Sequence, residues 1–246
     1  RGGLAAIYEE DLGSAGAGRS DLPRLAIVER VPDRVAPVSH LGAAGTMRKS
    51  PKYKAVLDLC GGTGSWSKPY HEDGYRVVVV TFGPALYRAH GGKWIYEDVR
   101  NFDVRPYLPV HGVLAAPPCT EFAIAGARHW QKKSATPSLL HEAVSIVEGC
   151  LRVVEEADPL WWALENPEGR LRRVLGSPQM VFDPSEFGER YNKKTLCWGN
   201  FSLPTPGRKK RFFGNFRNSY YPAPFRSDWR SITSLKFALA FFEANP

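Results

Sequence analysis

The chain has 246 residues, of which 43% are hydrophobic and 24% are charged, and this ordinary composition argues against general disorder. Its length suits one large domain or one domain with appendages. Lys and Arg total 33 against 25 Asp and Glu, so the formal charge of +8 favours an acidic partner without identifying one.

Features that the sequence lacks narrow the class of protein further. No apolar run reaches the ~18 residues needed to span a bilayer, and no basic-then-apolar signal stands at the start. The four cysteines are far apart and form no CxxC pair, which argues against a zinc ribbon and a disulfide scaffold. We therefore expect a reduced, cytoplasmic protein with no metal and no membrane partner.

Residues 1–46 differ from the rest of the chain. They are rich in Gly and Ala and show no sustained apolar period, so we predict a flexible or non-native extension. Met47 directly precedes Arg48-Lys49-Ser50-Pro51 and is a candidate for the natural start of the folded protein. A catalytic domain is then expected over 47–185.

From residue 54 onward, the sequence alternates between apolar runs and helical spacing. Leu139 to Val154 carries apolar residues at helical intervals, which predicts a helix over 138–156. β-Branched and apolar runs predict strands at 55–59, 76–82, 94–96, 112–116 and 161–164. Continuous apolar strands separated by helices imply an α/β fold with a mostly parallel sheet and helices on both faces.

The excess charge is concentrated near the C-terminus. Residues 190–230 hold ten basic residues and one acid, so this segment carries +9 and the rest of the chain carries −1. Aromatic residues alternate with these cations, and such a combination can hold phosphates and stack on bases. We predict a small basic aromatic recognition region over 186–230; the alternative is a solvated basic loop whose aromatic residues belong to the core.

The last segment, 231–246, is predicted to complete the catalytic domain with a helix. Residues 234–245 have helical spacing, with Leu235, Ala238, Leu239 and Phe242 expected on one face.

A glycine turn follows the first predicted strand and is the first candidate site. Asp58-Leu59-Cys60-Gly61-Gly62-Thr63-Gly64-Ser65 matches neither GxGxxG nor a P-loop, so dinucleotide and P-loop sites are disfavoured. With Asp98 near the end of a later strand, where it would bind an adenine amino group, the turn suits a nucleoside with a charged tail such as S-adenosylmethionine. An ordinary tight strand-to-helix turn is the alternative.

Two further motifs follow predicted strands. Pro117-Pro118-Cys119 would present a thiol rigidly at the carboxyl edge of the sheet, where a cysteine can serve as a nucleophile. A buried structural role is commoner for cysteine in general and is assigned to the other three. Glu165-Asn166-Pro167 would bring a carboxylate to the same pocket, whereas alone it would be an exposed turn.

Taken together, these motifs resemble the DNA cytosine-5 methyltransferase family, in particular its compact phage-type members. The resemblance runs from about Val56 to Leu171. Its elements are the glycine turn through Trp66, the proline-proline-cysteine motif, and Glu165-Asn166 with Pro167 in place of Val. Weaker similarities are Trp198-Gly199-Asn200 and Arg230-Ser231-Ile232-Thr233, which is similar to a late Arg-x-Leu-Thr motif.

The resemblance implies a Rossmann-like S-adenosylmethionine-dependent methyltransferase fold and methylation of carbon 5 of a flipped cytosine in DNA. Such proteins serve restriction-modification in bacteria or phage-infected cells. It implies Cys119 as nucleophile and Glu165 as the residue that binds the base. The implied cofactor contacts are Asp58, Cys60, Gly61, Gly62, Gly64, Ser65, Trp66, Phe82, Asp98, Val99 and Pro117. The implied DNA contacts are Pro118, Asn166, Lys193, Lys194, Arg208, Lys209, Lys210 and Arg211.

The sequence departs from the family in two places. No Gln-x-Arg-x-Arg motif is present, and Lys193-Lys194-Thr195 stands roughly where it is sought, so the cation that supports the cytosine carbonyl is open. No acid follows the second strand; Phe82 stands there and could stack on adenine. The alternatives are the same chemistry on RNA, transfer of a modified group, or a degenerate methyltransferase fold that binds nucleic acid. A zinc-dependent deaminase is disfavoured because its H-x-E and PCxxC signature is absent.

Overall fold

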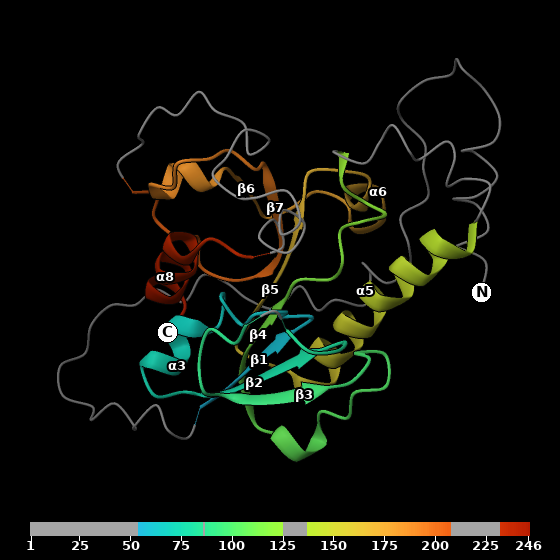
Figure 1. Ribbon diagram of the computed structural model, residues 1–246, viewed down its shortest axis with the longest axis vertical. Coiled ribbons are helices and arrows are strands. Elements are labelled where there is room, and N and C mark those ends of the chain that lie inside the picture. The colour runs from blue at the N-terminus through green and yellow to red at the C-terminus, as the bar shows by residue number, and fades with distance from the viewer. Residues whose placement is uncertain (1–53, 86, 125–136, 208–231) are drawn as a thin grey trace.

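A single seven-stranded sheet organises the protein in the computed structural model, which describes residues 54–85, 87–124, 137–207 and 232–246 (Figure 1). Its strand order is β3-β2-β1-β4-β5-β7-β6. The strands are β1 (Ala55–Leu59), β2 (Arg76–Thr81), β3 (Lys93–Tyr96), β4 (Val110–Ala115), β5 (Trp161–Pro167), β6 (Met180–Phe182) and β7 (Thr195–Asn200). The helices are α3 (Lys68–Glu72), α5 (Pro137–Ala157), α6 (Leu171–Leu175) and α8 (Leu235–Ala244), with 3-10 turns η2 (Arg105–Tyr107) and η4 (Pro184–Phe187).

Strand direction defines the fold. β1 to β5 pair in parallel, whereas β7 runs antiparallel to both β5 and β6. A sheet of this order with an antiparallel β7 is typical of the Rossmann-like fold of S-adenosylmethionine-dependent methyltransferases. The predicted α/β fold with a mostly parallel sheet is therefore confirmed.

The predicted strands and helix are present, with shifted ends. β4 begins at Val110, before the predicted 112–116, and β5 continues to Pro167, so Glu165 and Asn166 lie inside a strand and not in a turn after it. β6 and β7 were not predicted. Part of the segment predicted as a recognition region, Thr195–Asn200, is thus a strand of the central sheet.

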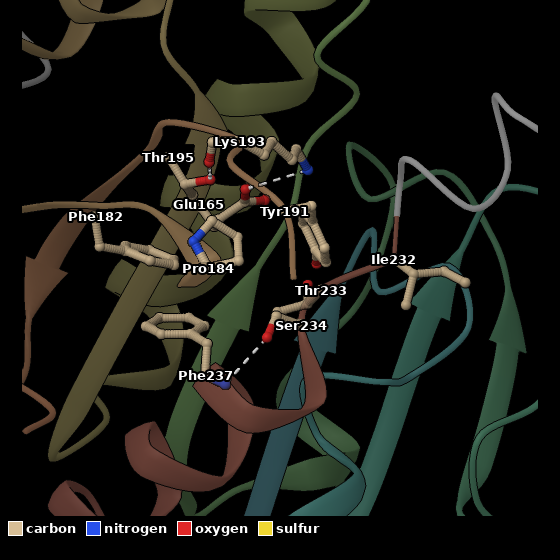
Figure 2. Close-up of a pocket in the computed structure, with 10 residues that line it drawn as sticks. All are labelled: Glu165, Phe182, Pro184, Tyr191, Lys193, Thr195, Ile232, Thr233, Ser234 and Phe237. Carbon is tan, nitrogen blue, oxygen red and sulfur yellow. Dashed lines mark hydrogen bonds and ion pairs between the residues drawn. The ribbon is translucent and has the colours of Figure 1, made fainter. Parts of the chain in front are cut away.

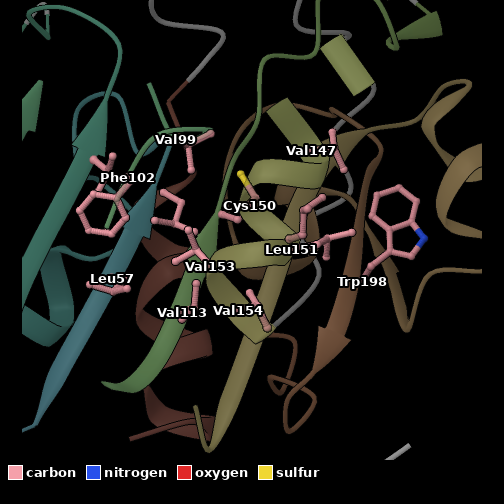
Figure 3. Close-up of a cluster of buried hydrophobic side chains, with 14 of the residues drawn as sticks. Leu57, Val99, Phe102, Val113, Val147, Cys150, Leu151, Val153, Val154 and Trp198 are labelled. Atoms are coloured by element: carbon pink, nitrogen blue, oxygen red, sulfur yellow. The ribbon is translucent and has the colours of Figure 1, made fainter. Parts of the chain in front are cut away.

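One face of the sheet is covered by α5 (Figure 1). Leu57 and Leu59 of β1 point to this face, as do their counterparts on β2, β4 and β5. Figure 3 shows α5 contributing Cys150, Leu151 and Val154 to the cluster. The helix is amphipathic because its apolar residues recur every three or four positions, and this stripe supplies the core.

The opposite face is covered by α3 and α8, which contact each other. Trp66 and Tyr70 pack here with Phe237 and Phe241 of α8. The ring centroids of Trp66 and Phe241 are 5.4 Å apart in an edge-on arrangement, which is favourable for aromatic pairs. The helix at the C-terminal end of the sequence is therefore part of the core.

The prediction of which residues form the apolar face of α8 is wrong in part. Leu235 and Leu239 are 48% and 49% exposed, while Phe237, Ala238 and Phe241 are buried. Two phenylalanines one turn apart bury more surface than the leucines, and Phe237 stacks on Phe182 at 4.0 Å between ring centroids. These rings set the rotation of the helix about its axis.

Replacing Phe241 should test this rotation. Phe241→Ala removes a fully buried ring that contacts Trp66, Trp161 and Phe201, and should lower the free energy of unfolding by about 3–5 kcal/mol. The matched control, Leu239→Ala on the same helix, should change it by about 0.5 kcal/mol or less because the side chain is half exposed. Urea unfolding of both variants measures the difference; equal losses would contradict this packing.

Candidate active site

The three predicted motifs lie at the carboxyl ends of three neighbouring parallel strands. The glycine turn follows β1, Pro117-Pro118-Cys119 follows β4, and Glu165 lies near the end of β5. β4 lies between β1 and β5, so the ends of these strands meet at one edge of the sheet. Open α/β sheets bind ligands at this edge. The structure therefore gathers the predicted cofactor turn, thiol and carboxylate on one side of the molecule.

The turn after β1 requires glycine for two reasons. Gly62 and Gly64 have φ angles of +54° and +71°, in the left-handed region that glycine adopts without strain. Gly61 is required for space, because a Cβ atom there would come within 2.4 Å of the Asp58 carboxylate. The backbone of the turn and the side chain of Asp58 thus form one packed unit.

Asp58 is a buried carboxylate at the base of this turn. It is 1% exposed, and Ser67 Oγ donates a hydrogen bond to its Oδ2 atom. Its other oxygen, Oδ1, has no hydrogen-bond partner within the described ranges. Burial raises the pKa of Asp58 to about 7, although the hydrogen bonds from Ser67 oppose this shift. An unsatisfied buried acceptor beside a glycine turn fits a ligand that brings an amino or ammonium group.

A chain of hydrogen bonds that runs from Gly92 through His90 and Ser67, which we call the relay, orients Asp58. Gly92 donates its backbone N–H to Nδ1 of His90 at 3.0 Å, so the ring proton of a neutral His90 lies on Nε2. Nε2 lies 3.1 Å from Ser67 Oγ, so its N–H donates a hydrogen bond to this oxygen, and the Ser67 hydroxyl in turn donates one to Asp58. Burial, together with the nearby ring of His71, lowers the pKa of His90 to about 4 and keeps it neutral. The sequence motifs do not single out Ser67 or His90.

Two further predicted residues come after β2 and β3 in the sequence: Phe82 lies in the β2–β3 connection, and Asp98 follows β3. Ala89 donates its N–H to the carbonyl of Thr63 at 2.8 Å, which ties the β2–β3 connection to the glycine turn. Phe82, directly after β2, is 87% exposed, so its ring is accessible for stacking. The Arg100 guanidinium donates hydrogen bonds to both carboxylate oxygens of Asp98 and lowers the pKa of Asp98 below its ordinary value.

Other predicted cofactor residues lie inside the protein. Trp66 is 2% exposed and packs against α8, and Val99 is 4% exposed in the core under α5. Ser65 is also buried, with its hydroxyl 2.7 Å from that of Thr63. In this structure these three side chains support the turn from within, and a ligand at the sheet edge would not reach the Trp66 ring.

The loop after β4 is fastened to the end of β5. Asn166, which is fully buried, donates from Nδ2 to the carbonyl of Pro117 at 2.9 Å. Pro117 is buried, Pro118 is exposed and Cys119 is half-buried, and the carbonyl of Cys119 accepts the N–H of Ala123 at 2.8 Å. Cys119 therefore lies at the start of a tight turn, and the hydrogen bond from Asn166 of β5 fixes the residues just before it.

Glu165 lies on the other side of β5, which faces α8. It is 9% exposed, and Lys193 Nζ is 3.8 Å from its Oε1 atom. Figure 2 shows the two side chains pointing toward each other at the rim of a small pocket, with the ring of Tyr191 beside them. The pocket is lined by Glu165, Phe182, Pro184, Tyr191, Lys193, Thr195, Ile232, Thr233, Ser234 and Phe237. Cys119 is not among these residues.

The basic residues among the predicted DNA contacts fall into two groups. Lys194 pairs with Glu168 at 3.3 Å, as Lys193 does with Glu165, so both lysines stand beside carboxylates at the end of β5. Arg208, Lys209, Lys210 and Arg211 lie outside the described residues, as does the whole segment 208–230. Within the described ranges, no three His, Cys, Asp or Glu residues cluster as metal ligands would. None of the helices in those ranges has the length and apolar character needed to cross a bilayer.

The chain was compared with protein families, curated proteins and solved structures. No protein-family model and none of the curated proteins matches the chain. It is similar to a structure described provisionally as a DNA modification methyltransferase encoded within an E. coli prophage, at 16% identity and a TM-score of 0.41. This match covers 64% of the chain and 52% of that protein, so the chain spans about half the length of the prophage protein.

A second similar structure is magnesium protoporphyrin IX methyltransferase from Synechocystis PCC 6803 with bound S-adenosylmethionine. The identity is 14% and the TM-score is 0.37, over 60% of the chain and 71% of that protein. Neither similarity assigns a substrate or an activity to the chain.

The shifted pKa values of Asp58 and His90 predict opposite effects of pH on the stability of the protein. Because the pKa of Asp58 is raised from 3.8 to about 7, the wild type loses stability as pH rises across that window. Because the pKa of His90 is lowered from 6.5 to about 4, the wild type loses stability as pH falls across that window. Relative to wild type, Asp58→Asn should gain stability with rising pH, and His90→Gln with falling pH, by up to ~1.4 kcal/mol per pH unit.

Urea unfolding of the three proteins between pH 4.5 and 7.5 measures these differences. All other titrating groups are shared, so they cancel when each variant is compared with wild type. A stability difference between Asp58→Asn and wild type that stays constant across this range would contradict the raised pKa of Asp58.

Proposed function

We propose that this protein methylates carbon 5 of cytosine in DNA, with S-adenosylmethionine as the methyl donor and Cys119 as a covalent nucleophile. The observation that carries the proposal is the hydrogen bond from Asn166 to the Pro117 carbonyl. It ties the thiol-bearing loop after β4 to the strand that bears Glu165. A rigid thiol and a nearly buried carboxylate on adjacent parallel strands are what covalent activation of a pyrimidine needs.

The chemistry follows from the weakness of cytosine carbon 5 as a nucleophile. The thiolate of Cys119 adds to carbon 6, and the electron pair of the 5,6 double bond makes carbon 5 enamine-like. Glu165 hydrogen-bonds ring nitrogen 3 and the exocyclic amine, which orients the base and stabilises the adduct. S-adenosylmethionine, when bound, supplies the methyl group. Loss of the carbon 5 proton and expulsion of the Cys119 thiolate restore the ring and the enzyme.

Residues around the glycine turn would hold the cofactor. Oδ1 of Asp58 would accept a hydrogen bond from the amino group of the methionine part, which would satisfy this atom. The exposed ring of Phe82 would stack on adenine, and Asp98, kept ionised by Arg100, would accept from the adenine amino group. The glycines let the ligand approach the backbone closely.

Lys193 is the cation best placed to support the cytosine carbonyl. Its ammonium lies 3.8 Å from Glu165, and its side chain is 22% exposed. A cation beside the carboxylate that orients the base would offset the negative charge that develops on the ring when the thiolate adds. Lys194 and the basic residues from Arg208 onward would hold phosphates while the target base is flipped out of the duplex.

A mechanism-based trap tests the proposal directly. Oligonucleotides that contain 5-fluorocytosine cannot lose a proton from carbon 5, so the Cys119 adduct should persist as a covalent complex on a denaturing gel. DNA and RNA versions, offered with S-adenosylmethionine, separate the two polymers. Cys119→Ser should form no complex, whereas Thr120→Ala, at the exposed neighbouring position, should form it normally.

Glu165→Gln should slow complex formation by about 10²-fold or more. Glu168→Gln is the matched control, because Glu168 is also paired with a lysine near the same strand end, and it should have little effect. Absence of a complex on every DNA and RNA substrate would refute the proposed chemistry.

The role of Phe82 is tested by cofactor binding. Loss of base stacking on an aromatic ring costs ~1–3 kcal/mol, so Phe82→Ala should raise the Kd for S-adenosylmethionine roughly 5- to 150-fold. Leu160→Ala is the control, because Leu160 is 72% exposed and precedes β5 at the opposite edge of the sheet. Isothermal titration calorimetry measures both. An unchanged Kd for Phe82→Ala would exclude the stacking role.

A further inference from the structure

Two thiols from distant parts of the chain meet beneath the glycine turn. Cys60 is the first residue after β1, and Cys150 lies on α5; their Sγ atoms are 3.9 Å apart. Cys150 is fully buried, whereas Cys60 is half-buried and packs against the same core cluster from the turn. Figure 3 shows Cys150 on α5 among the buried side chains next to the sheet. The thiol of the predicted cofactor turn therefore has a second thiol in contact from the opposite layer.

The two thiols differ in their exposure to solvent and in their environment. The contact with Cys60 and burial raise the pKa of Cys150 well above its ordinary value, so Cys150 keeps its proton until it reacts. Cys60 is partly exposed to solvent and belongs to a turn with a left-handed φ of +54°. An oxidant from solvent therefore meets Cys60 first, and Cys150 is in position to react with an oxidised Cys60.

We propose that Cys60 and Cys150 form a reversible disulfide when the protein meets a small-molecule disulfide such as oxidised glutathione, and that this bond weakens cofactor binding. The Cys60 thiolate attacks one sulfur of the small disulfide and expels a first glutathione thiolate. The Cys150 sulfur then attacks Cys60 and expels the second glutathione thiolate, which takes up the Cys150 proton as it leaves as a thiol. Two protein thiols are oxidised, and one small disulfide is reduced to two thiols that take up protons.

Formation of the Cys60–Cys150 disulfide would displace the glycine turn of the proposed cofactor site. A disulfide brings the sulfurs from 3.9 Å to ~2.05 Å apart, so one side must move. Cys150 is fully buried among the core side chains under α5, so the turn moves toward α5. Asp58 points to the other face of β1 and touches Gly61 with no spare room. Drawing Cys60 toward α5 therefore pulls the turn away from the carboxylate on which, in the proposed function, the cofactor depends.

The test uses the full chain carrying Cys119→Ser, which removes the proposed nucleophile as a competing site of oxidation. The protein is equilibrated in glutathione buffers of increasing oxidised fraction, alkylated and digested, and its cross-linked peptides are identified by mass spectrometry. We expect a Cys60–Cys150 peptide, lighter by two hydrogen atoms, that disappears with dithiothreitol. S-adenosylmethionine binding by calorimetry should weaken about tenfold or more on oxidation and recover on reduction.

The matched control adds Cys150→Ser to the same background. It should bind S-adenosylmethionine normally when reduced, and when oxidised it should form no cross-link and carry only glutathione on Cys60. Failure of the Cys119→Ser protein to form the cross-link in the most oxidising buffer would overturn the proposal, and so would a cross-link that leaves cofactor affinity unchanged. If the reduced protein binds no S-adenosylmethionine, the proposed function fails instead, and the cross-link yield alone decides whether the thiol pair is oxidised.

Discussion

The site depends on the register between β4 and β5. Ala115 pairs with Leu164, so the residues that leave β4 and those that end β5 emerge at the same height. The buried hydrogen bond from Asn166 to the Pro117 carbonyl then closes the gap between the two chain segments. A slip of one residue in β5 would turn Asn166 to the α8 face and Glu165 to the α5 face, because side chains alternate along a strand. The thiol loop would lose its support, and the carboxylate would lose its pocket.

The same alternation of side chains gives the two faces of β1 different roles. Leu57 and Leu59 build the core under α5, while Asp58 faces α3 and takes on a charge that the interior solvates poorly. The protein stabilises this group through a hydrogen bond from Ser67, whose hydroxyl a neutral His90 contacts in turn, and through glycine backbone packed against it. Buried polar groups that are only partly satisfied are typical of sites that await a ligand. The unsatisfied Oδ1 atom is consistent with that condition.

Sequence patterns predicted the central strands well because each is built mainly from apolar residues, and short apolar runs between turn signals form buried parallel strands. They did not predict β6 and β7, since Thr195–Asn200 reads as part of a basic aromatic stretch and its pairing with β5 depends on contacts far along the chain. The orientation of α8 was wrong in part, because ring packing by Phe237 and Phe241 outweighs the spacing of the leucines. The relay through Ser67 and His90 has no signature in sequence spacing, since 22 residues separate the two.

The basic stretch near the C-terminus is not uniform, and its first two lysines show why. Lys193 has a side chain 22% exposed and turns into the pocket beside Glu165, whereas Lys194 is 53% exposed and pairs with Glu168 at the surface. Adjacent residues on an extended chain point in opposite directions, so one segment can serve two partners. Under the proposed function, the inward lysine meets the flipped base and the outward lysine begins the series of phosphate contacts. The excess charge of the chain would then extend from the active site itself and would not form a separate surface.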